Sequence, residues 1–186
     1  MAKSEIKIAG FGGQGVILAG EIIGKAATIY DGKFATLTHS YGPEARGGAC
    51  SAQIIIADEK ISYPYAVSPD VLVLMSQEAY GLYMDELNPG GILIIEKDLV
   101  KMDSDIAPKF FGIPATRMAE ELGSRIVLNI VMLGFLTAIS GLVTHEAMEK
   151  AIRETVPRGT EYINLLAFDK GYSYGLQVKG CTAILL

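Results

Sequence analysis

Apolar residues follow two patterns along the chain. Short runs rich in Val, Ile and Leu recur at residues 5–10, 33–40, 50–61, 68–76 and 92–96, and they predict strands. Residues 15–32 and 77–87 instead repeat apolar positions three and four apart, which predicts helices with one buried face. The strand runs do not alternate strictly with polar residues, as expected when both faces of a sheet are covered. The sequence therefore predicts an α/β fold, with a mainly parallel sheet and helices packed on both faces.

The last third of the chain has a different pattern. Residues 118–151 look mainly helical, and this region ends near residues 157–159, before a short further segment. We therefore treat residues 1–186 as a single domain with residues 160–186 as a C-terminal extension. Whether the extension packs on its own domain or on another chain is open at this stage.

Residues 125–143 form the most apolar segment of the chain. Asn129, Gly134, Thr137 and Ser140 interrupt it, so its purely apolar stretches are too short for a hydrocarbon layer of about 30 Å. We expect a helix buried in the core or at a subunit contact rather than a membrane span.

Composition narrows the functional classes. Sixteen basic and 21 acidic residues give a net charge of −5, which argues against the basic surface that nucleic acids require. The first residues lack the apolar segment and cleavage site of an export signal, so we expect a cytoplasmic protein. Cys50 and Cys181 lie far apart without a CxxC motif, which argues against a disulfide framework, a zinc site or an iron–sulfur cluster on this chain.

A glycine-rich turn, "GFGGQG", joins the first predicted strand to the first predicted helix. Gly10, Gly12 and Gly15 match the GxGxxG pattern, whose bare backbone lets an anion approach its N–H groups at a helix start. A dinucleotide site also needs an acidic residue at the end of the second strand, where this chain has "THSYG". A dinucleotide, another anionic ligand and a purely structural turn remain as alternatives. Gln14 favours a ligand, because its amide can both donate and accept hydrogen bonds.

A second glycine-rich loop spans residues 39–49, "HSYGPEARGGA". Loops that follow adjacent parallel strands emerge at one edge of a sheet, so we expect the two glycine-rich loops to face each other. Arg46 is then a candidate to bind phosphate or carboxylate, and Gly47 and Gly48 would allow a close approach. The alternative is a solvated arginine paired with Glu44.

Two histidines need an interpretation. His39, beside Tyr41 at a predicted strand end, is a candidate for ligand contact or proton transfer, although a single histidine there is more often structural. His145 is expected at a helix start, with residues 144–147 forming the cap.

The two loops together resemble a known family. "GFGGQGVILAGEIIGKAA" followed by "HSYGPEARGGACSAQIII" is similar to the γ subunit, or γ domain, of the 2-oxoacid:ferredoxin oxidoreductases. The resemblance continues through "PDVLVLMSQEAY" and "NIVMLGFL", and so covers most of residues 7–142. Separate short γ chains look most like those of the 2-oxoglutarate and branched-chain oxoacid enzymes, although pyruvate and indolepyruvate relatives share the patterns.

The resemblance implies a multi-subunit enzyme that converts a 2-oxoacid, coenzyme A and oxidised ferredoxin into acyl-CoA, carbon dioxide and reduced ferredoxin. It implies thiamine diphosphate on the α and β subunits and iron–sulfur clusters on other subunits, including a ferredoxin-like δ subunit. It also implies that the γ chain alone is inactive and contributes no catalytic residue or metal ligand. From the apolar composition we also expect self-association.

The resemblance also makes contact with coenzyme A a hypothesis for the two loops, and a purely architectural docking role is the alternative. The candidate residues are Gly10, Gly12, Gly13, Gln14, Gly15, Ser40, Arg46, Gly47 and Gly48. Asn129 falls where the family has an amide within an apolar helix, and we expect it to tie that helix to a loop by a buried hydrogen bond. A stand-alone Rossmann-like nucleotide-binding protein and an oligomeric scaffold remain the alternative functions.

Overall fold

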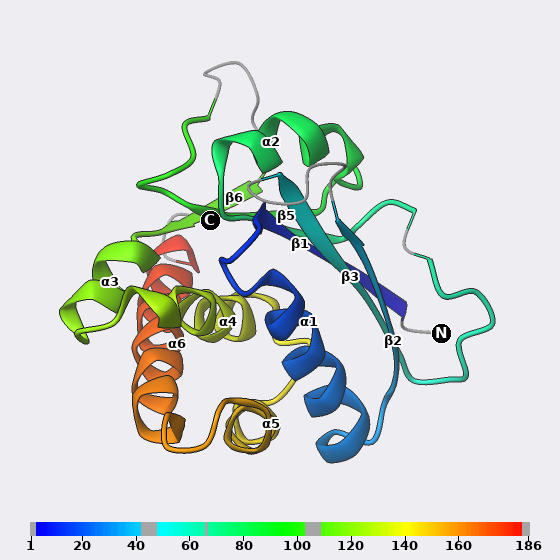
Figure 1. Ribbon diagram of the computed structural model, residues 1–186. Helices are drawn as coiled ribbons and strands as arrows, with labels where there is room; N and C mark the ends of the chain where they lie inside the picture. Colours follow the sequence, from blue (N-terminus) through cyan, green and yellow to red (C-terminus); the bar gives the residue numbers. More distant parts are fainter. Residues whose placement is uncertain (1–2, 42–47, 66, 103–108, 184–186) are drawn as a thin grey trace.

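The fold is built on one six-stranded sheet (Figure 1). The computed structural model describes residues 3–41, 48–65, 67–102 and 109–183. The strand order is β2-β3-β1-β4-β5-β6. The strands are β1 (Lys3–Phe11), β2 (Phe34–Tyr41), β3 (Ala49–Ala57), β4 (Val71–Leu74), β5 (Ile92–Glu96) and β6 (Lys109–Ile113).

Five of the six strands point in the same direction. β1, β4, β5 and β6 pair in parallel, whereas β3 runs antiparallel to both of its neighbours, β1 and β2. The expectation that the first two strands lie side by side is wrong, because β3 separates them. The short connection after β2 produces a hairpin, since a parallel crossover needs a dozen or more residues. The mainly parallel sheet that the sequence predicts is confirmed.

The helices cover the two faces of the sheet unequally (Figure 1). Among the described residues, one face carries a single α-helix, α2 (Gln77–Tyr83), which continues into a 3₁₀ turn, η2 (Met84–Glu86). The other face carries the remaining helices. These are α1 (Val16–Lys25), which continues as a π-helical turn η1 (Ala26–Tyr30), α3 (Ala115–Glu121), α4 (Leu128–Ser140), α5 (His145–Thr155) and α6 (Glu161–Ala183).

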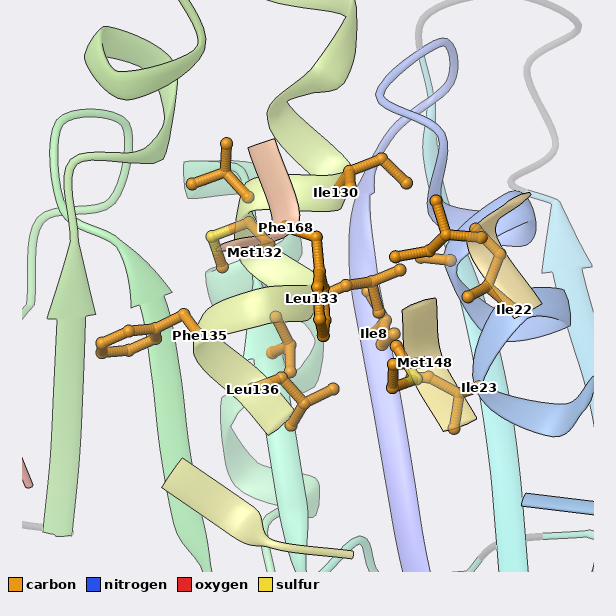
Figure 2. Packing of buried hydrophobic residues seen from close by; sticks show 14 of the residues in the cluster. Ile8, Ile22, Ile23, Ile130, Met132, Leu133, Phe135, Leu136, Met148 and Phe168 are labelled. Carbon is orange, nitrogen blue, oxygen red and sulfur yellow. The ribbon is translucent and has the colours of Figure 1, made fainter. Parts of the chain in front are cut away.

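The main hydrophobic core lies between the sheet and the larger helical layer. Ile8 of β1 is surrounded there by Ile22 and Ile23 of α1 and by Leu133 of α4, all fully buried (Figure 2). A smaller cluster lies under α2 on the other face. Burial of so many branched aliphatic side chains supplies most of the driving force for this arrangement.

The apolar segment at residues 125–143 forms α4, in which every residue from Leu128 to Ile139 is buried. The predicted buried helix is thus confirmed. Within the described part of the chain, no helix has both the length and the hydropathy needed to cross a bilayer.

The C-terminal extension is mostly one long helix, α6, packed directly on α4. The two backbones are very close: a Cβ atom added to Gly171 would lie 2.0 Å from the carbonyl oxygen of Val131. The packing partner that the sequence leaves open is therefore this chain's own α4.

Candidate functional site

The glycine-rich turn lies between the end of β1 and the start of α1. Gly13 and Gly15 have φ angles of 99° and 73°, in the left-handed region that side chains other than glycine rarely adopt. Gly15 is the N-cap of α1. The turn therefore aims its backbone and the positive end of a ten-residue helix at the carboxyl edge of the sheet.

Gln14 holds the turn in place through its side-chain amide. Its Oε1 accepts a hydrogen bond from the backbone N–H of Phe11 (2.7 Å), and its Nε2 donates to the carbonyl oxygen of Met75 (2.9 Å). The side chain thus joins the turn to the segment that follows β4. A ligand contact of Gln14 stays a prediction, for which the second hydrogen of Nε2 and the second lone pair of Oε1 remain.

The two glycine-rich loops meet at the same edge of the sheet, as predicted. The N–H of Gly12 donates to the carbonyl oxygen of Gly48 (3.2 Å), and Phe11 is paired with Ala49 across β1 and β3. The reason differs from the expected one: β1 and β2 are not neighbours, but both end at this edge. Arg46 and Gly47 lie outside the described residues.

Part of the backbone of the turn remains available to a ligand. The N–H groups of Gly12 and Gln14 bond internally, the latter to the carbonyl oxygen of Phe11 (3.1 Å). Within the part of the chain that the structure describes, the N–H groups of Gly13 and Gly15 have no hydrogen-bond partner. These two donors, with the first N–H groups of α1, form a potential anion-binding surface.

A groove of about 420 Å³ opens beside the turn. It is lined by Phe11, Gly13, Gln14, Leu99, Arg125, Ile126 and Leu128. The size falls in the range of small-ligand pockets, and the lining combines apolar side chains with one cation. The groove can therefore hold a ligand that has both an apolar portion and a negative charge.

Arg125 supplies that cation, and the sequence reasoning did not select it. Its side chain is 64% exposed, and its Nε lies 4.0 Å from Oε1 of Glu120, at the limit of an ion pair. A weak, exposed pair leaves the guanidinium able to bind an anion. The available signal was an arginine directly before an apolar helix, on a short 3₁₀ turn, η3 (Arg125–Val127).

Asn129 joins the turn to the central helix α4. Its Nδ2 donates to the carbonyl oxygen of Gly15 (3.2 Å), and its side chain is buried. The predicted buried hydrogen bond between this helix and a loop is confirmed. Because α4 follows η3 directly, the same contact fixes the position of Arg125 relative to the turn.

Glu96, at the end of β5, shapes the opposite wall of the groove. Its buried carboxylate accepts hydrogen bonds from the backbone N–H groups of Asp98 (3.0 Å) and Thr116 (3.2 Å). Burial raises its pKa above the ordinary value of 4.5, although the backbone donors act in the opposite direction. Glu96 thereby fixes the turn that carries Leu99 into the groove. The sequence reasoning missed this residue, since a glutamate at a strand end is usually solvated.

The remaining candidates lie at two separate places. Ser40, His39 and Tyr41 are exposed at the end of β2, where the rings of His39 and Tyr41 meet edge to face at 5.2 Å. His145 starts α5, and Oγ1 of Thr144 accepts a hydrogen bond from the N–H of Ala147 (3.2 Å) as the N-cap. The predicted helix-start role of His145 is confirmed.

The described groups of the site suit the binding of a ligand. The site offers backbone donors, a guanidinium and an apolar wall, which together suit an anionic organic ligand. Among the described residues, no group of three or more His, Cys, Asp or Glu side chains is placed to hold a metal ion.

Comparison with known proteins gives consistent matches over most of the chain. The family model described as "Pyruvate ferredoxin/flavodoxin oxidoreductase" matches residues 5–174. The 2-oxoglutarate synthase subunit KorC of Methanocaldococcus jannaschii is 51% identical over 173 residues, which cover 91% of this chain and 92% of that protein.

Two further matches differ in length. The keto/oxoacid ferredoxin oxidoreductase γ subunit of Geobacter sulfurreducens has a solved structure that matches with a TM-score of 0.87 and 38% identity, covering 95% of this chain and 98% of that one. Ketoisovalerate oxidoreductase subunit VorA of Methanothermobacter thermautotrophicus is 35% identical over 81% of this chain, but over only 31% of its own length.

Proposed function

The chain belongs to the pyruvate ferredoxin/flavodoxin oxidoreductase family, and from that premise we propose that its carboxyl-edge groove contacts coenzyme A within a multi-subunit enzyme. It is a γ subunit of a 2-oxoacid:ferredoxin oxidoreductase, a subunit that does not carry out the reaction alone. The family match and the full-length relatives favour this function over a stand-alone nucleotide-binding protein or a scaffold.

The expected partners are the α, β and ferredoxin-like δ subunits, with thiamine diphosphate and the iron–sulfur clusters on those chains. The VorA relative supports an intimate contact with another subunit, because there a unit similar to this chain is part of a chain about three times as long. Ile126, which is 88% exposed beside the groove, supplies an apolar contact for such a subunit.

Coenzyme A fits the donors that the groove presents. Its phosphates match the guanidinium of Arg125 and the N–H groups of Gly13 and Gly15, which have no hydrogen-bond partner among the described residues. Arg46 on the neighbouring loop is a second candidate. The less polar portions of coenzyme A match Phe11 and Leu128. A groove of about 420 Å³ takes part of the molecule, so the remainder would lie against another subunit. Coenzyme A supplies the thiol that accepts the acyl group; this chain's residues bind and orient it.

The test is steady-state kinetics of the assembled complex. Removing the Arg125 side chain, as in Arg125→Ala, is expected to raise KM for coenzyme A at least about tenfold, since a charge-assisted hydrogen bond contributes about 1.5–3 kcal/mol. Arg46→Ala is expected to act in the same direction. KM for the 2-oxoacid should not change, because the groove does not bind it.

Arg153→Ala, at an exposed arginine of α5, is the matched control for the loss of one positive charge. The proposal fails if Arg125→Ala and Arg46→Ala leave KM for coenzyme A equal to that of the control. Calorimetry of the isolated chain with NAD and FAD tests the alternative function, and tight binding of either would support a nucleotide-binding protein instead.

We propose 2-oxoglutarate as the oxoacid, on the strength of the 51% identity to a 2-oxoglutarate synthase subunit. The complex purified with its natural partners should form acyl-CoA faster from 2-oxoglutarate than from pyruvate or ketoisovalerate. A preference for either of the other two would contradict this assignment.

A further inference from the structure

Strand β2 leaves one edge of the sheet open. It is the terminal strand of the six, and within the described residues β3 is its one strand partner (Figure 1). The pairing with β3 runs without a bulge from Phe34 opposite Ala57 to Tyr41 opposite Cys50. Alternate backbone N–H and C=O groups of an antiparallel edge strand point away from its neighbour. Within the described residues, no further backbone bond is formed by β2, so it presents a row of outward donors and acceptors.

The strand also lacks the features that usually prevent edge pairing. Its eight residues, "FATLTHSY", include no lysine, no acidic residue and no proline. Natural edge strands are usually blocked by such residues or by a bulge. Phe34 and Tyr41, near its two ends, are 47% and 66% exposed. An uncharged, regular strand with exposed aromatic ends is suited to accept another strand.

We propose that β2 pairs antiparallel with β2 of a second copy of this chain, across a twofold axis near Leu37 and Thr38. Pairing like with like closes the assembly at two copies, whereas pairing β2 with β6 would be head to tail and would continue into filaments. Because β2 contains no Lys, Arg, Asp or Glu, pairing two copies of this strand places no like charges opposite each other. This inference concerns self-association alone and does not depend on the proposed binding of coenzyme A.

The side chains of β2 suit such a pair on both faces of the sheet. Thr36 and Thr38 lie on the face away from α1, and threonine pairs across strands are favourable. Leu37 lies on the α1 face, where it packs against the main core, so two copies would bring these leucines together at the axis.

Two tyrosines beside β2 enlarge the surface that a second copy could bury. Oγ1 of Thr36 contacts the carbonyl oxygen of Pro64 (3.4 Å), which places the neighbouring Tyr63 and Tyr65 next to the strand. These tyrosines are 61% and 55% exposed, and their rings lie 5.5 Å apart. Backbone pairing of two strands alone is marginal in water, so the exposed aromatic area is needed for a stable dimer.

The first test is the molar mass of the full-length chain in solution. Sedimentation equilibrium at micromolar concentration should give twice the chain mass of 19.9 kDa. Thr36→Lys combined with Thr38→Lys should weaken the dimer at least about tenfold, because it brings like charges opposite each other. Ser173→Lys combined with Gln177→Lys, on the exposed side of α6, adds the same charge away from the edge and should leave the dimer intact.

The second test is crosslinking, which does not depend on a destabilising change. The variants Thr36→Cys and Thr38→Cys are made in a Cys181→Ser background. Each variant alone tests a register in which the new cysteine faces its own copy. An equimolar mixture of the two tests the register centred on Leu37, in which residue 36 faces residue 38. Mild oxidation should link two copies in at least one of these samples, whereas Ser173→Cys should not crosslink. The proposal is overturned by a monomeric wild-type chain, by a dimer that the lysine pair does not weaken, or by the absence of any crosslink. It is also overturned if the lysine pair blocks assembly with other subunits without changing self-association.

Discussion

At the scale of single residues, the glycine turn combines backbone strain with close packing, and two substitutions separate these effects. Gly13 and Gly15 both have positive φ angles, but a Cβ atom on Gly13 would meet nothing within 4 Å, whereas one on Gly15 would lie 2.3 Å from Nδ2 of Asn129. The two positions therefore share the conformational cost and differ in the steric one.

We predict that Gly13→Ala lowers the free energy of unfolding by about 1–2 kcal/mol, the cost of a side chain in the left-handed region. Gly15→Ala should cost clearly more, because it also displaces Asn129 and its hydrogen bond to the turn. Denaturant unfolding of both variants measures the difference. Equal losses would mean that the Asn129 contact adds nothing.

Glu96 gives a prediction on pH. Its raised pKa means that the folded chain holds the proton more tightly than the unfolded chain. Its contribution to stability is therefore complete below the ordinary pKa of 4.5 and declines as the pH rises above it, because the unfolded chain ionises first. Wild-type stability should thus fall relative to Glu96→Gln as the pH rises from about 4 towards 7.

The measurement is denaturant unfolding of the two proteins at a series of pH values, with Glu59→Gln at an exposed position as the control for the loss of one carboxylate. A difference between wild type and Glu96→Gln that stays constant over this range would contradict the assignment.

The residues that the sequence could and could not reveal differ in a physical way. Asn129 was predictable because an amide within an apolar helix needs a buried partner. Arg125 and Glu96 were not predictable, because the importance of each depends on contacts distant in sequence. Arg125 becomes relevant through its place beside Phe11, and Glu96 through its bond to Thr116.

At the scale of elements, the apolar runs correctly predicted the strands in the centre of the sheet. The predicted strand at residues 92–96 coincides with β5, whereas β6 was not predicted. The predicted helical character of the C-terminal third is confirmed by α5 and α6. The sequence did not show that residues 161–183 form one long helix, because their glycines and aromatic residues obscure the one-sided pattern of a surface helix. The neighbouring helix explains two of those glycines, since Gly171 and Gly175 contact α4.

The α4–α6 contact gives a third prediction. Gly171→Ala should destabilise the chain by about 3 kcal/mol or more, because the added Cβ overlaps the Val131 carbonyl and the helices must move apart. Gly180→Ala, in the same helix with nothing within 4 Å, should instead raise stability by about 0.5–1 kcal/mol through helix propensity. Thermal unfolding of both variants tests this, and a mild effect of Gly171→Ala would show that the contact is looser than described.

At the scale of the whole molecule, the unequal helical layers leave the carboxyl edge of the sheet with a groove, an exposed Ile126 and backbone N–H groups that have no partner among the described residues. The apolar pattern was enough to predict the fold class, and the two glycine-rich loops were enough to predict that they meet. They could not predict the hairpin that separates β1 from β2, because strand order depends on the whole sheet. The role that we propose for this arrangement is to bind and position a ligand, while other subunits carry out the reaction itself.

The most direct test of the account is reconstitution of the enzyme from separately purified subunits. We predict that this chain alone forms no acyl-CoA and that the partner subunits without it form acyl-CoA slowly or not at all. Adding the chain to its partners should restore 2-oxoacid-dependent reduction of ferredoxin. Full activity of the partners in its absence, or acyl-CoA formation by this chain alone, would contradict the account.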